Sequence, residues 1–338
     1  MGIFKINYLI TGAYGFIGAH LTRFLSLQGH SVVGIDNSSP YYDSELKLMR
    51  KMHLLSGEGI KLLDLDLTHR AEVGKVFKEY EIDIVIHLAA QAGVRISEHS
   101  NFRYVQDNLV GFQNVMQATV DSGVRSFLYA SSSSVYGNSL NAPYSENEEN
   151  LKPISFYGMT KLMNEMMASL STGSTNTNKR AMRFFTVYGP WGRPDMAYLR
   201  LIQSAMSGNK FHLLGDGSAI RDFTFIDDVV LGIYKLALEL HSKSEYTSDI
   251  VNIGKGNPES MMEMIKLVSG YVGKPIDLER HPHNPYDVQA THANVSKLFT
   301  ITNFKPEVTL SEGISKTVKW ATTQITQDQL ESWVSSVD

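Results

Sequence analysis

Short apolar runs alternate with longer amphipathic segments through the first half of the chain. The strand-like runs are residues 6–10, 32–35, 60–65, 82–88 and 125–131. Each is mostly apolar at successive positions, as strands buried on both faces of a sheet are. The segments between them place apolar residues at helical spacing. This alternation predicts an α/β fold with a parallel, doubly wound sheet and right-handed crossovers.

The first strand-like run leads into a glycine-rich turn, Gly12-x-x-Gly15-x-x-Gly18, after which helical spacing resumes. A strand, a glycine turn and a helix in this order form the context of a Rossmann-like dinucleotide-binding turn. There the glycines allow a tight turn, a close approach of the backbone to a pyrophosphate, and packing of the helix on the strand. The first N–H groups of the helix would meet a phosphate at the positive end of the helix dipole.

The second strand-like run ends in Asp36, which strengthens this prediction. A carboxylate there accepts hydrogen bonds from the adenosine ribose hydroxyls and repels a 2′-phosphate. No Lys or Arg follows before Lys47, so we expect NAD rather than NADP. Asp66 follows the third run, where an adenine could lie, although capping of the next helix is nearly as well supported. After the fourth run, Ala89 and Ala90 leave room for a flat ligand in the sheet's crevice.

The alternation gives way to a Gly- and Pro-rich segment a little beyond the middle of the chain. Helical spacing over 157–171 precedes this segment, and the residues near 249–254 predict one more strand of the large sheet. We expect a Rossmann-like NAD-binding domain over residues 1–188, completed by that returning strand. Residues 189–338 are then expected to form mainly a smaller substrate-binding lobe over the carboxyl edge of the sheet.

Composition sets further limits on the function. The 338 residues are 43% hydrophobic and carry a net charge of −4, which indicates a large core and neither a nucleic-acid nor a membrane surface. There is no transmembrane span or signal-peptide pattern. The absence of cysteine excludes disulfides and thiolate metal sites, so we expect a cytoplasmic protein. The 11 histidines, of which His281 and His283 flank a proline, show no metal-site spacing, and we expect no metal.

Two further segments carry side chains suited to proton transfer. Four serines, residues 131–134, follow the fifth strand-like run, and Tyr157 and Lys161 stand at the start of a predicted helix. Their spacing of four puts the phenol and the ammonium on one helical face. A free phenol has a pKa of about 10. A neighbouring ammonium, together with an oxidised nicotinamide, lowers the pKa and favours the phenolate, so Tyr157 is a candidate general base.

These motifs resemble the extended short-chain dehydrogenases/reductases that act on sugar nucleotides, over essentially the whole chain. The matching elements are Gly12-x-x-Gly15-x-x-Gly18, Asp36-Asn37, His87-Leu88-Ala89-Ala90, Tyr157-x-x-x-Lys161 and Arg221-Asp222-Phe223. The resemblance implies that Ser132 helps to activate the sugar hydroxyl. Nucleotide-sugar 4,6-dehydratases typically continue with an Asp-Glu pair, and UDP-glucuronate decarboxylases with a Glu at the second position. Here Ser133 and Ser134 stand there, so neither acid chemistry is supported.

Three stretches are most similar to the UDP-glucuronate 4-epimerases. They are Asp36-Asn37 with Tyr41-Tyr42-Asp43, Gln91-Ala92-Gly93-Val94-Arg95, and the run from Arg183 to Met196, which reads RFFTVYGPWGRPDM. In the last run, Thr186 stands where hexose epimerases usually have Asn. One departure is Pro285-Tyr286-Asp287, where the family usually has Pro-Gly-Asp, which puts the phosphate contacts of that loop in doubt.

The resemblance implies a full set of site residues. The catalytic group is Tyr157, Lys161 and Ser132. The NAD site comprises Gly12, Gly15, Phe16, Ile17, Gly18, Asp36, Asn37, Asp66, Leu67, Leu88, Ala89, Ala90, Asn108, Tyr157 and Lys161. The substrate site comprises Arg95, Ser132, Ser133, Ser134, Thr186, Arg193, Arg221 and Asp287, in which Thr186, Arg193 and the serines hold the sugar carboxylate while Arg221 and Asp287 hold the nucleotide.

The implied reaction is NAD-dependent 4-epimerisation of UDP-glucuronate through a transient 4-keto sugar. Three alternatives stay open: 4-epimerisation of neutral UDP-hexoses or UDP-N-acetylhexosamines with Arg193 merely structural, decarboxylation of UDP-glucuronate, and a nucleotide-binding regulator without turnover. The resemblance also implies a homodimer joined through a four-helix bundle formed by residues 105–122 and 157–171.

Overall fold

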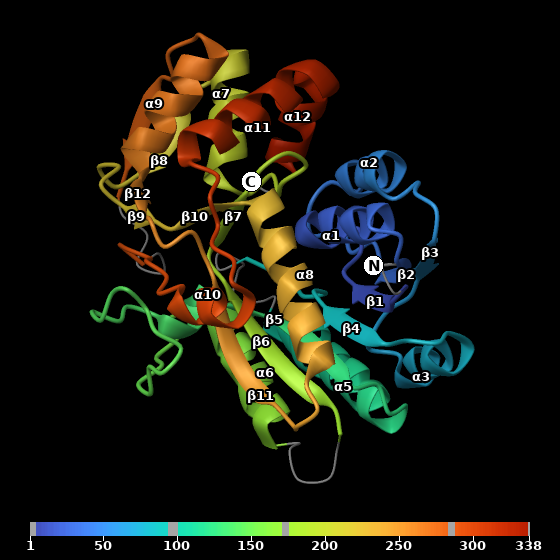
Figure 1. The fold of residues 1–338 in the computed structure, drawn as a ribbon. Helices are drawn as coiled ribbons and strands as arrows, with labels where there is room; N and C mark the ends of the chain where they lie inside the picture. Colours follow the sequence, from blue (N-terminus) through green and yellow to red (C-terminus); the bar gives the residue numbers. More distant parts are fainter. Residues whose placement is uncertain (1–4, 94–100, 171–175, 283–287, 337–338) are drawn as a thin grey trace.

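The computed structural model describes residues 5–93, 101–170, 176–282 and 288–336. Its centre is a seven-stranded sheet in which every neighbouring pair of strands is parallel (Figure 1). The strands are β1 (Asn7–Thr11), β2 (Ser31–Asp36), β3 (Ile60–Asp64), β4 (Ile84–His87), β5 (Ser126–Ser132), β6 (Asn178–Phe184) and β11 (Ser248–Ile253). Their order is β11-β6-β5-β4-β1-β2-β3, so the direction of winding reverses between β1 and β4. The predicted doubly wound α/β fold is confirmed.

Helices cover both faces of this sheet, and each face has its own apolar core. One layer holds α1 (Phe16–Leu27), α2 (Ser44–Leu54), α8 (Ile226–Ser242) and α10 (Ser296–Thr302). The other holds α3 (Arg70–Glu79), α5 (Gly111–Asp121) and α6 (Phe156–Leu170). The segment expected as one helix over 105–122 begins differently. After α4 (Asn101–Tyr104), residues Val105–Val110 form a π-helix, a feature often found near functional sites.

A smaller lobe packs over the carboxyl ends of the strands (Figure 1). Its helices are α7 (Ala197–Ser207), α9 (Met261–Val272), α11 (Leu310–Gln324) and α12 (Gln327–Ser335). Short strand pairs complete it and join it to the sheet: β7 (Thr186–Tyr188) with β10 (Phe223–Phe225), β8 (Phe211–Leu214) with β13 (Leu278–His281), and β9 (Ile220–Arg221) with β12 (Glu259–Ser260). Although α8 and β11 lie within residues 189–338, α8 packs on β5 and β6, and β11 pairs with β6. The chain therefore leaves the sheet for the lobe and returns to it.

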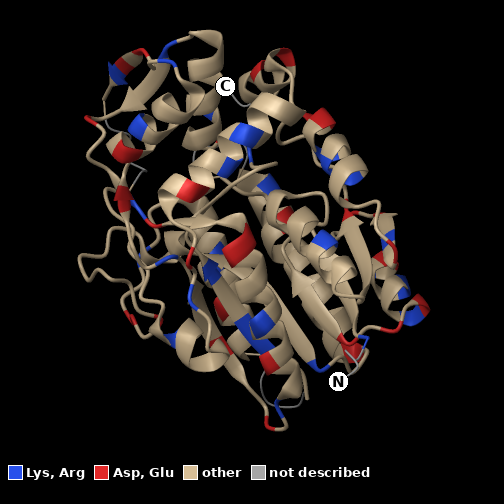
Figure 2. Ribbon diagram, turned by 45° about the horizontal axis from the view of Figure 1, so that its top comes forward, with Lys and Arg blue, Asp and Glu red and all other residues tan. Residues whose placement is uncertain are grey.

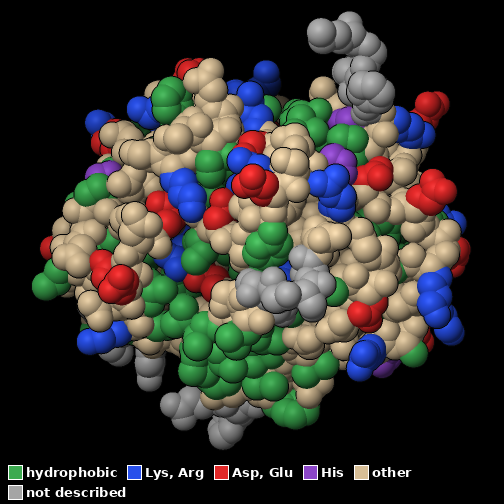
Figure 3. Space-filling view, turned by 60° about the horizontal axis from the view of Figure 1, so that its bottom comes forward, with side chains coloured by type: hydrophobic (Ala, Val, Ile, Leu, Met, Phe, Trp, Pro, Cys, Tyr) green, Lys and Arg blue, Asp and Glu red, His purple; other side chains and the backbone are tan. Residues whose placement is uncertain are grey.

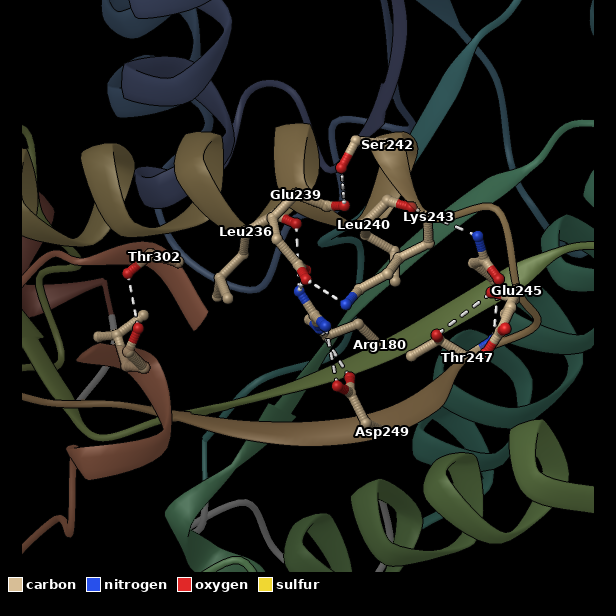
Figure 4. A network of polar contacts seen from close by, with 12 residues as sticks. Arg180, Leu236, Glu239, Leu240, Ser242, Lys243, Glu245, Thr247, Asp249 and Thr302 are labelled. Atoms are coloured by element: carbon tan, nitrogen blue, oxygen red, sulfur yellow. Dashed lines mark hydrogen bonds and ion pairs between the residues drawn. The ribbon is translucent and has the colours of Figure 1, made fainter. Parts of the chain in front are cut away.

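A buried ionic network fastens α8 to the outer strands of the sheet (Figure 4). Arg180 on β6 donates from Nε and Nη2 to the two carboxylate oxygens of Asp249 on β11, at 2.6 and 2.8 Å. Its Nη1 donates to Glu239 on α8 at 2.7 Å, and Lys243 pairs with the same carboxylate at 2.8 Å. A buried guanidinium must have its donors satisfied, and here two carboxylates satisfy them, so this network is a structural feature of the fold.

Charged residues of both signs are interspersed over the elements (Figure 2). Within the described ranges, no helix combines the length and the apolar character needed to cross a membrane.

Candidate active site

A cavity of about 880 Å³ lies between the carboxyl ends of the strands and the lobe. The sheet contributes the glycine turn, the end of β2 and the serine segment after β5, and the lobe contributes residues of α7 and β8. Predicted site residues that line the cavity are Gly12, Gly15, Phe16, Ile17, Gly18, Asp36, Asn37, Asp66, Leu67, Leu88, Ala89, Ala90, Ser132, Ser133, Ser134, Tyr157, Lys161, Thr186, Arg193 and Arg221. Arg95 and Asp287 lie outside the described residues.

The glycine turn is shaped by close backbone contacts. Gly12 has φ +73°, and a Cβ atom on it would lie 2.8 Å from the Ala89 nitrogen on the neighbouring strand end. A Cβ atom on Gly18 would lie 2.0 Å from the Gly12 carbonyl oxygen. Helix α1 begins after Gly15 with no side-chain cap and no acidic residue in its first turn. Its N-terminus therefore presents backbone N–H groups and a positive dipole end to the cavity, which suits a phosphate.

Asp36 ends β2 beside this turn and is fixed by the backbone. Its carboxylate accepts hydrogen bonds from the N–H groups of Tyr14 and Ser38, at 3.0 and 2.9 Å. Lys47, however, lies 3.7 Å from the same carboxylate, and both side chains are nearly buried. Spacing along the sequence suggested that no basic residue is near Asp36, and this was wrong in space, because α2 folds back over the end of β2. A carboxylate and an ammonium therefore share this edge.

The remaining expected NAD residues divide into two groups. Leu67, Leu88 and the alanines line the cavity, whereas Asn108 does not. Asn108 is buried in the π-helix and exchanges hydrogen bonds with the backbone of Gln91 at 2.7 and 3.1 Å. It also donates to Thr160 on α6 at 3.0 Å, so the structure places it as a brace beneath the cavity.

Asp66 does not cap the next helix, the alternative to adenine contact, because α3 begins after His69 without a side-chain cap; its carboxylate closes a local turn instead. One of its oxygens accepts the N–H and the hydroxyl of Thr68, at 2.9 and 2.7 Å, and the other accepts the Asn37 amide at 3.1 Å. Burial alone would raise its pKa, but the hydrogen bonds from Thr68 and Asn37 lower it. Asp66 and Asn37 nevertheless line the cavity, so contact with a ligand is compatible with this role.

Ser132, Tyr157 and Lys161 come together where β5 meets α6. The Lys161 ammonium lies 5.8 Å from the centre of the Tyr157 ring and donates to the Ala130 carbonyl at 2.9 Å. The Ser132 hydroxyl accepts the Ser134 N–H at 3.1 Å, which caps the short 3₁₀ helix Ser133–Tyr136. Ser132, Ser133 and Ser134 all line the cavity. Thr186 at the start of β7 lines the same cavity.

Burial and neighbouring charges set the acidity of this group. Burial raises the pKa of Tyr157, while the positive charge of Arg193 and a hydrogen bond with Ser132 lower it. Burial lowers the pKa of Lys161 to about 8, against a raising contribution from Glu165. Beneath them, burial lowers the pKa of His87 to about 3, so its ring is neutral. In the protein alone, the largest influence on Tyr157 is therefore desolvation, and the depression of its pKa that the sequence led us to expect requires further positive charge.

Arg193 projects into the cavity from the segment before α7, already paired with a carboxylate. Its Nε and Nη2 donate to the two oxygens of Asp195 at 3.0 and 2.5 Å, a bidentate ion pair. The Tyr41 ring lies 5.9 Å from the guanidinium carbon, and the Tyr41 hydroxyl donates to Asp195 at 3.4 Å. Arg193 and Asp195 are about a quarter and a fifth exposed, at 24% and 21%, so the pair is within reach of a ligand.

Arg221 reaches the cavity from β9, where it donates to the carbonyls of Ile220 and Gln289 at 2.8 and 3.0 Å. The neighbouring Asp222 of the same motif is fully buried and accepts the N–H groups of Lys255, Gly256 and Ala293 at 2.7, 2.9 and 2.9 Å. Asp222 therefore joins two segments of the chain to β9, while its neighbours Arg221 and Phe223 line the cavity.

Several cavity residues escaped the sequence interpretation. Lys47, Tyr41, Asp195 and His212 line the cavity, and of these only Tyr41 and Asp195 fell in a quoted motif. Their roles depend on contacts between distant segments, which spacing does not reveal.

One grouping of histidines also appears only in space. His212 on β8 and Glu279 and His281 on the paired β13 bring their ligand atoms within 4.8 Å of one another. Glu279 lies 3.4 Å from His281 and 3.6 Å from Lys210, so its carboxylate already has polar partners.

Comparisons with known proteins agree with this geometry. A model of the NAD dependent epimerase/dehydratase family matches residues 8–254. The chain is 35% identical to the UDP-glucuronate 4-epimerase of Thermodesulfobacterium geofontis, over 93% of this chain and 95% of that protein. It also resembles the UDP-glucuronic acid 4-epimerase of Bacillus cereus solved with UDP-glucuronic acid and NAD, with a TM-score of 0.85 and 32% identity over 94% of this chain and 99% of that one. The UDP-glucose 4-epimerase of Thermotoga maritima solved with UDP-glucose matches with a TM-score of 0.82 and 26% identity, over 94% and 99% of the two chains. The chain therefore belongs to the NAD-dependent epimerase/dehydratase family.

Proposed function

We propose that this protein catalyses the NAD-dependent 4-epimerisation of UDP-glucuronate to UDP-galacturonate. The observation that carries the proposal is the presence in one cavity of Arg193, the Tyr157–Lys161 pair and three hydroxyls, Ser132 to Ser134. The pair suits proton transfer at a sugar hydroxyl, and the guanidinium suits a uronic acid carboxylate. The relatives named for UDP-glucuronate epimerisation support the same substrate.

The residues present fit NAD. A Cβ atom on Gly12 or Gly18 would collide with backbone atoms, so the tight turn of a dinucleotide site requires glycine at both positions, and the uncapped start of α1 offers N–H donors to a pyrophosphate. Asp36 stands at the end of β2, where the adenosine ribose would lie. Bound NAD would supply the hydride acceptor and donor for C4 of the sugar.

Tyr157 is the proposed base. Its phenolate takes the proton from the sugar O4 as C4 is oxidised, and later returns it as C4 is reduced. Lys161 holds the phenolate by its charge, and Ser132 donates to the reacting oxygen. Between the two half-reactions, the 4-keto sugar turns within the cavity and presents its other face.

A uronic acid adds a hazard, because the 4-keto form is a β-keto acid that can lose carbon dioxide. That loss requires the C5–carboxylate bond to stand roughly parallel to the π orbitals of the ketone. We assign to Arg193, with hydroxyl donors from the serines and Thr186, the task of holding the carboxylate out of that alignment.

A second candidate function is 4-epimerisation of a neutral UDP-hexose or UDP-N-acetylhexosamine. The observation that favours it is the bidentate pairing of Arg193 with Asp195, which leaves the guanidinium neutralised without any substrate carboxylate. Decarboxylation is less well supported because Ser134 stands where the decarboxylases typically have Glu. A regulator without turnover is disfavoured by the assembled Ser132, Tyr157 and Lys161.

The test is incubation of the purified protein with a panel of UDP-sugars without added NAD, followed by anion-exchange separation of the products. We expect UDP-galacturonate from UDP-glucuronate, with NAD(H) released from the denatured protein. Efficient turnover of UDP-glucose with little activity on UDP-glucuronate would replace this proposal with the neutral-sugar one. A UDP-pentose as the main product would identify a decarboxylase.

We further propose that the protein is a homodimer joined through α6 and the helical segment 101–121. Hydrophobic side chains gather on one face of the molecule (Figure 3). Helix α6 exposes Met159, Met163, Met166 and Leu170, which recur at helical spacing along one stripe. Sedimentation should give twice the mass of one chain, and replacing Met163 and Met166 by Glu should give a monomer. A wild type that sediments as a monomer would refute this assembly.

A further inference from the structure

Arg50 is a buried cation for which the proposed mechanism has no use. It lies on α2 with 0% exposure, and the ion pairs found within the described part of the chain do not include it. An unpaired buried charge is costly, so its hydrogen bonds must compensate. Lys47 on the same helix, by contrast, has a carboxylate partner. The role of the Arg50 cation must therefore be inferred from the groups that accept its hydrogen bonds.

Those acceptors come from the glycine turn, the loop before α2 and the segment before Arg193, and each of these segments contributes neighbouring residues to the cavity lining. Arg50 donates from Nε to the Trp191 carbonyl and from Nη2 to the Gly192 carbonyl, both at 2.8 Å. Its Nη1 donates to the carbonyl of Tyr14, within the glycine turn, at 3.2 Å, and to the Tyr42 hydroxyl at 2.5 Å. One planar guanidinium thus joins the dinucleotide turn to the two residues that precede Arg193.

The backbone before Arg193 needs such a restraint. Trp191 has φ +59°, a left-handed conformation that a bulky residue rarely adopts. Its ring stacks on His53 of α2 with centres 5.2 Å apart, so α2 holds the side chain as well as the carbonyl. A conformation of this kind persists only where the surroundings determine it from several sides.

A second contact fastens the same segment to α1. The ring of His20 lies 2.9 Å from the Pro190 carbonyl through Nε2. Burial lowers the pKa of His20 to about 4, so the ring is neutral at physiological pH and Nε2–H donates to the carbonyl. The segment before Arg193 is therefore held by α1 and α2, the helices that follow the first two strands of the sheet, although it leads into α7 of the lobe.

We infer that Arg50 is a positioning residue for sugar recognition: it sets the backbone from which Arg193 reaches the substrate, and it ties that backbone to the dinucleotide turn. The inference rests on the proposed function, in which Arg193 binds the uronate carboxylate. A lysine keeps the charge of Arg50 but has no planar fork, so it cannot serve both segments at once. Displacement of the backbone then moves the guanidinium of Arg193 without changing Arg193 itself.

The experiment compares Arg50→Lys with Arg180→Lys, a matched change at a buried arginine whose partner elements, α8 and β11, contribute no residue to the cavity lining. Calorimetry on the NAD-loaded proteins gives the Kd values of UDP-glucuronate, UDP-glucose and UDP. In Arg50→Lys we expect an unchanged Kd for UDP. The preference for UDP-glucuronate over UDP-glucose should fall by about tenfold to a hundredfold, the loss that a misplacement of about 1 Å can cause. Arg180→Lys should lower the thermal midpoint and leave that preference intact.

A further variant, His20→Ala, removes the other anchor of the segment and should lower the preference in the same direction by less. It keeps the test decisive if Arg50→Lys does not fold. An unchanged preference for UDP-glucuronate in the folded Arg50→Lys variant overturns the inference. If only His20→Ala can be measured, an unchanged preference in that variant overturns it. An equal loss in Arg180→Lys also overturns it. A wild type without any preference for UDP-glucuronate instead overturns the proposed function on which the inference depends.

Discussion

At the scale of single residues, the cofactor preference depends on how Asp36 and Lys47 share one edge of the site. Replacing Asp36 by Ala removes acceptors for the ribose hydroxyls, so NAD binding should weaken by roughly 1–3 kcal/mol, the range for hydrogen bonds to a charged group. It also leaves the nearly buried Lys47 ammonium without its carboxylate partner. NADP, whose 2′-phosphate can pair with that ammonium, should therefore gain relative to NAD.

Calorimetry of the apo-protein with NAD⁺ and NADP⁺ measures both effects. Lys47→Met in the Asp36→Ala background is the control, because it removes the cation and should abolish the gain of NADP. Equal binding of the two cofactors by the wild type would show that Asp36 does not select NAD.

Tyr157 itself can be tested with a change of one atom. Tyr157→Phe should fold and bind UDP-glucuronate normally but lose turnover by about 10²–10⁴-fold, the usual contribution of a general base. Ser132→Ala should cost less, since a water molecule can partly replace its hydroxyl. Rates under saturating substrate, with Kd from calorimetry, separate turnover from binding. Near-normal turnover in Tyr157→Phe would eliminate the proposed mechanism.

At the scale of elements, α6 sets the pH dependence because it carries Tyr157 and Lys161 one turn apart. Burial raises the pKa of Tyr157 and lowers the pKa of Lys161 to about 8. Tyr157 can act as a base only as the deprotonated phenolate, and Lys161 can stabilise that phenolate only as the protonated ammonium. Because the pKa of Tyr157 lies above that of Lys161, the phenolate–ammonium form is the minor singly protonated state of the pair. Activity should therefore rise as the pair loses its first proton, near the Lys161 pKa of about 8, and fall as the pair loses its second proton at higher pH.

Replacing Lys161 by Met removes the cation that favours the phenolate. The rising limb of the kcat/KM profile for UDP-glucuronate should then move to higher pH, where Tyr157 alone ionises, and the falling limb of the coupled pair should disappear. Profiles of the wild type and the variant across neutral and alkaline pH provide the measurement. A rising limb at the same pH in both proteins would indicate that Lys161 does not act on Tyr157.

The sequence predicted the individual helices and strands better than it predicted the contacts between them. The apolar runs that predict β1, β2 and β4, and the helical spacing that predicts α6, arise from residues a few positions apart, so the pattern contains them. The fold-back of α2, which brings Lys47 to Asp36 and Arg50 to Trp191, is a contact between distant segments. No local period specifies it. The same holds for Asn108, whose buried amide braces Gln91 and α6 instead of lining the cavity.

At the scale of the whole molecule, the lobe's leading segment and α6 line the same cavity, and we propose that Arg193 on that segment selects the substrate. Arg193→Ala should weaken UDP-glucuronate binding by roughly 2–4 kcal/mol, the range for breaking a desolvated charge pair. With the carboxylate no longer held, some UDP-4-keto-pentose should appear beside UDP-galacturonate. Anion-exchange separation of the products measures both effects, and unchanged kinetics would assign Arg193 a structural role.

Asp195 changes the expected selectivity, because it supplies an internal partner for this guanidinium. A neutral sugar therefore does not leave Arg193 unpaired in the wild type, and discrimination against UDP-glucose is smaller than an isolated arginine would give.

Asp195→Asn keeps the shape of the side chain but removes its charge. UDP-glucose would then leave a partly buried cation without a counter-charge, which is costly, while UDP-glucuronate would restore the pair. The ratio of kcat/KM for UDP-glucuronate over UDP-glucose should rise in Asp195→Asn and fall in Arg193→Ala. A fall in both variants would mean that Asp195 orients Arg193 for the substrate and does not compete with its carboxylate.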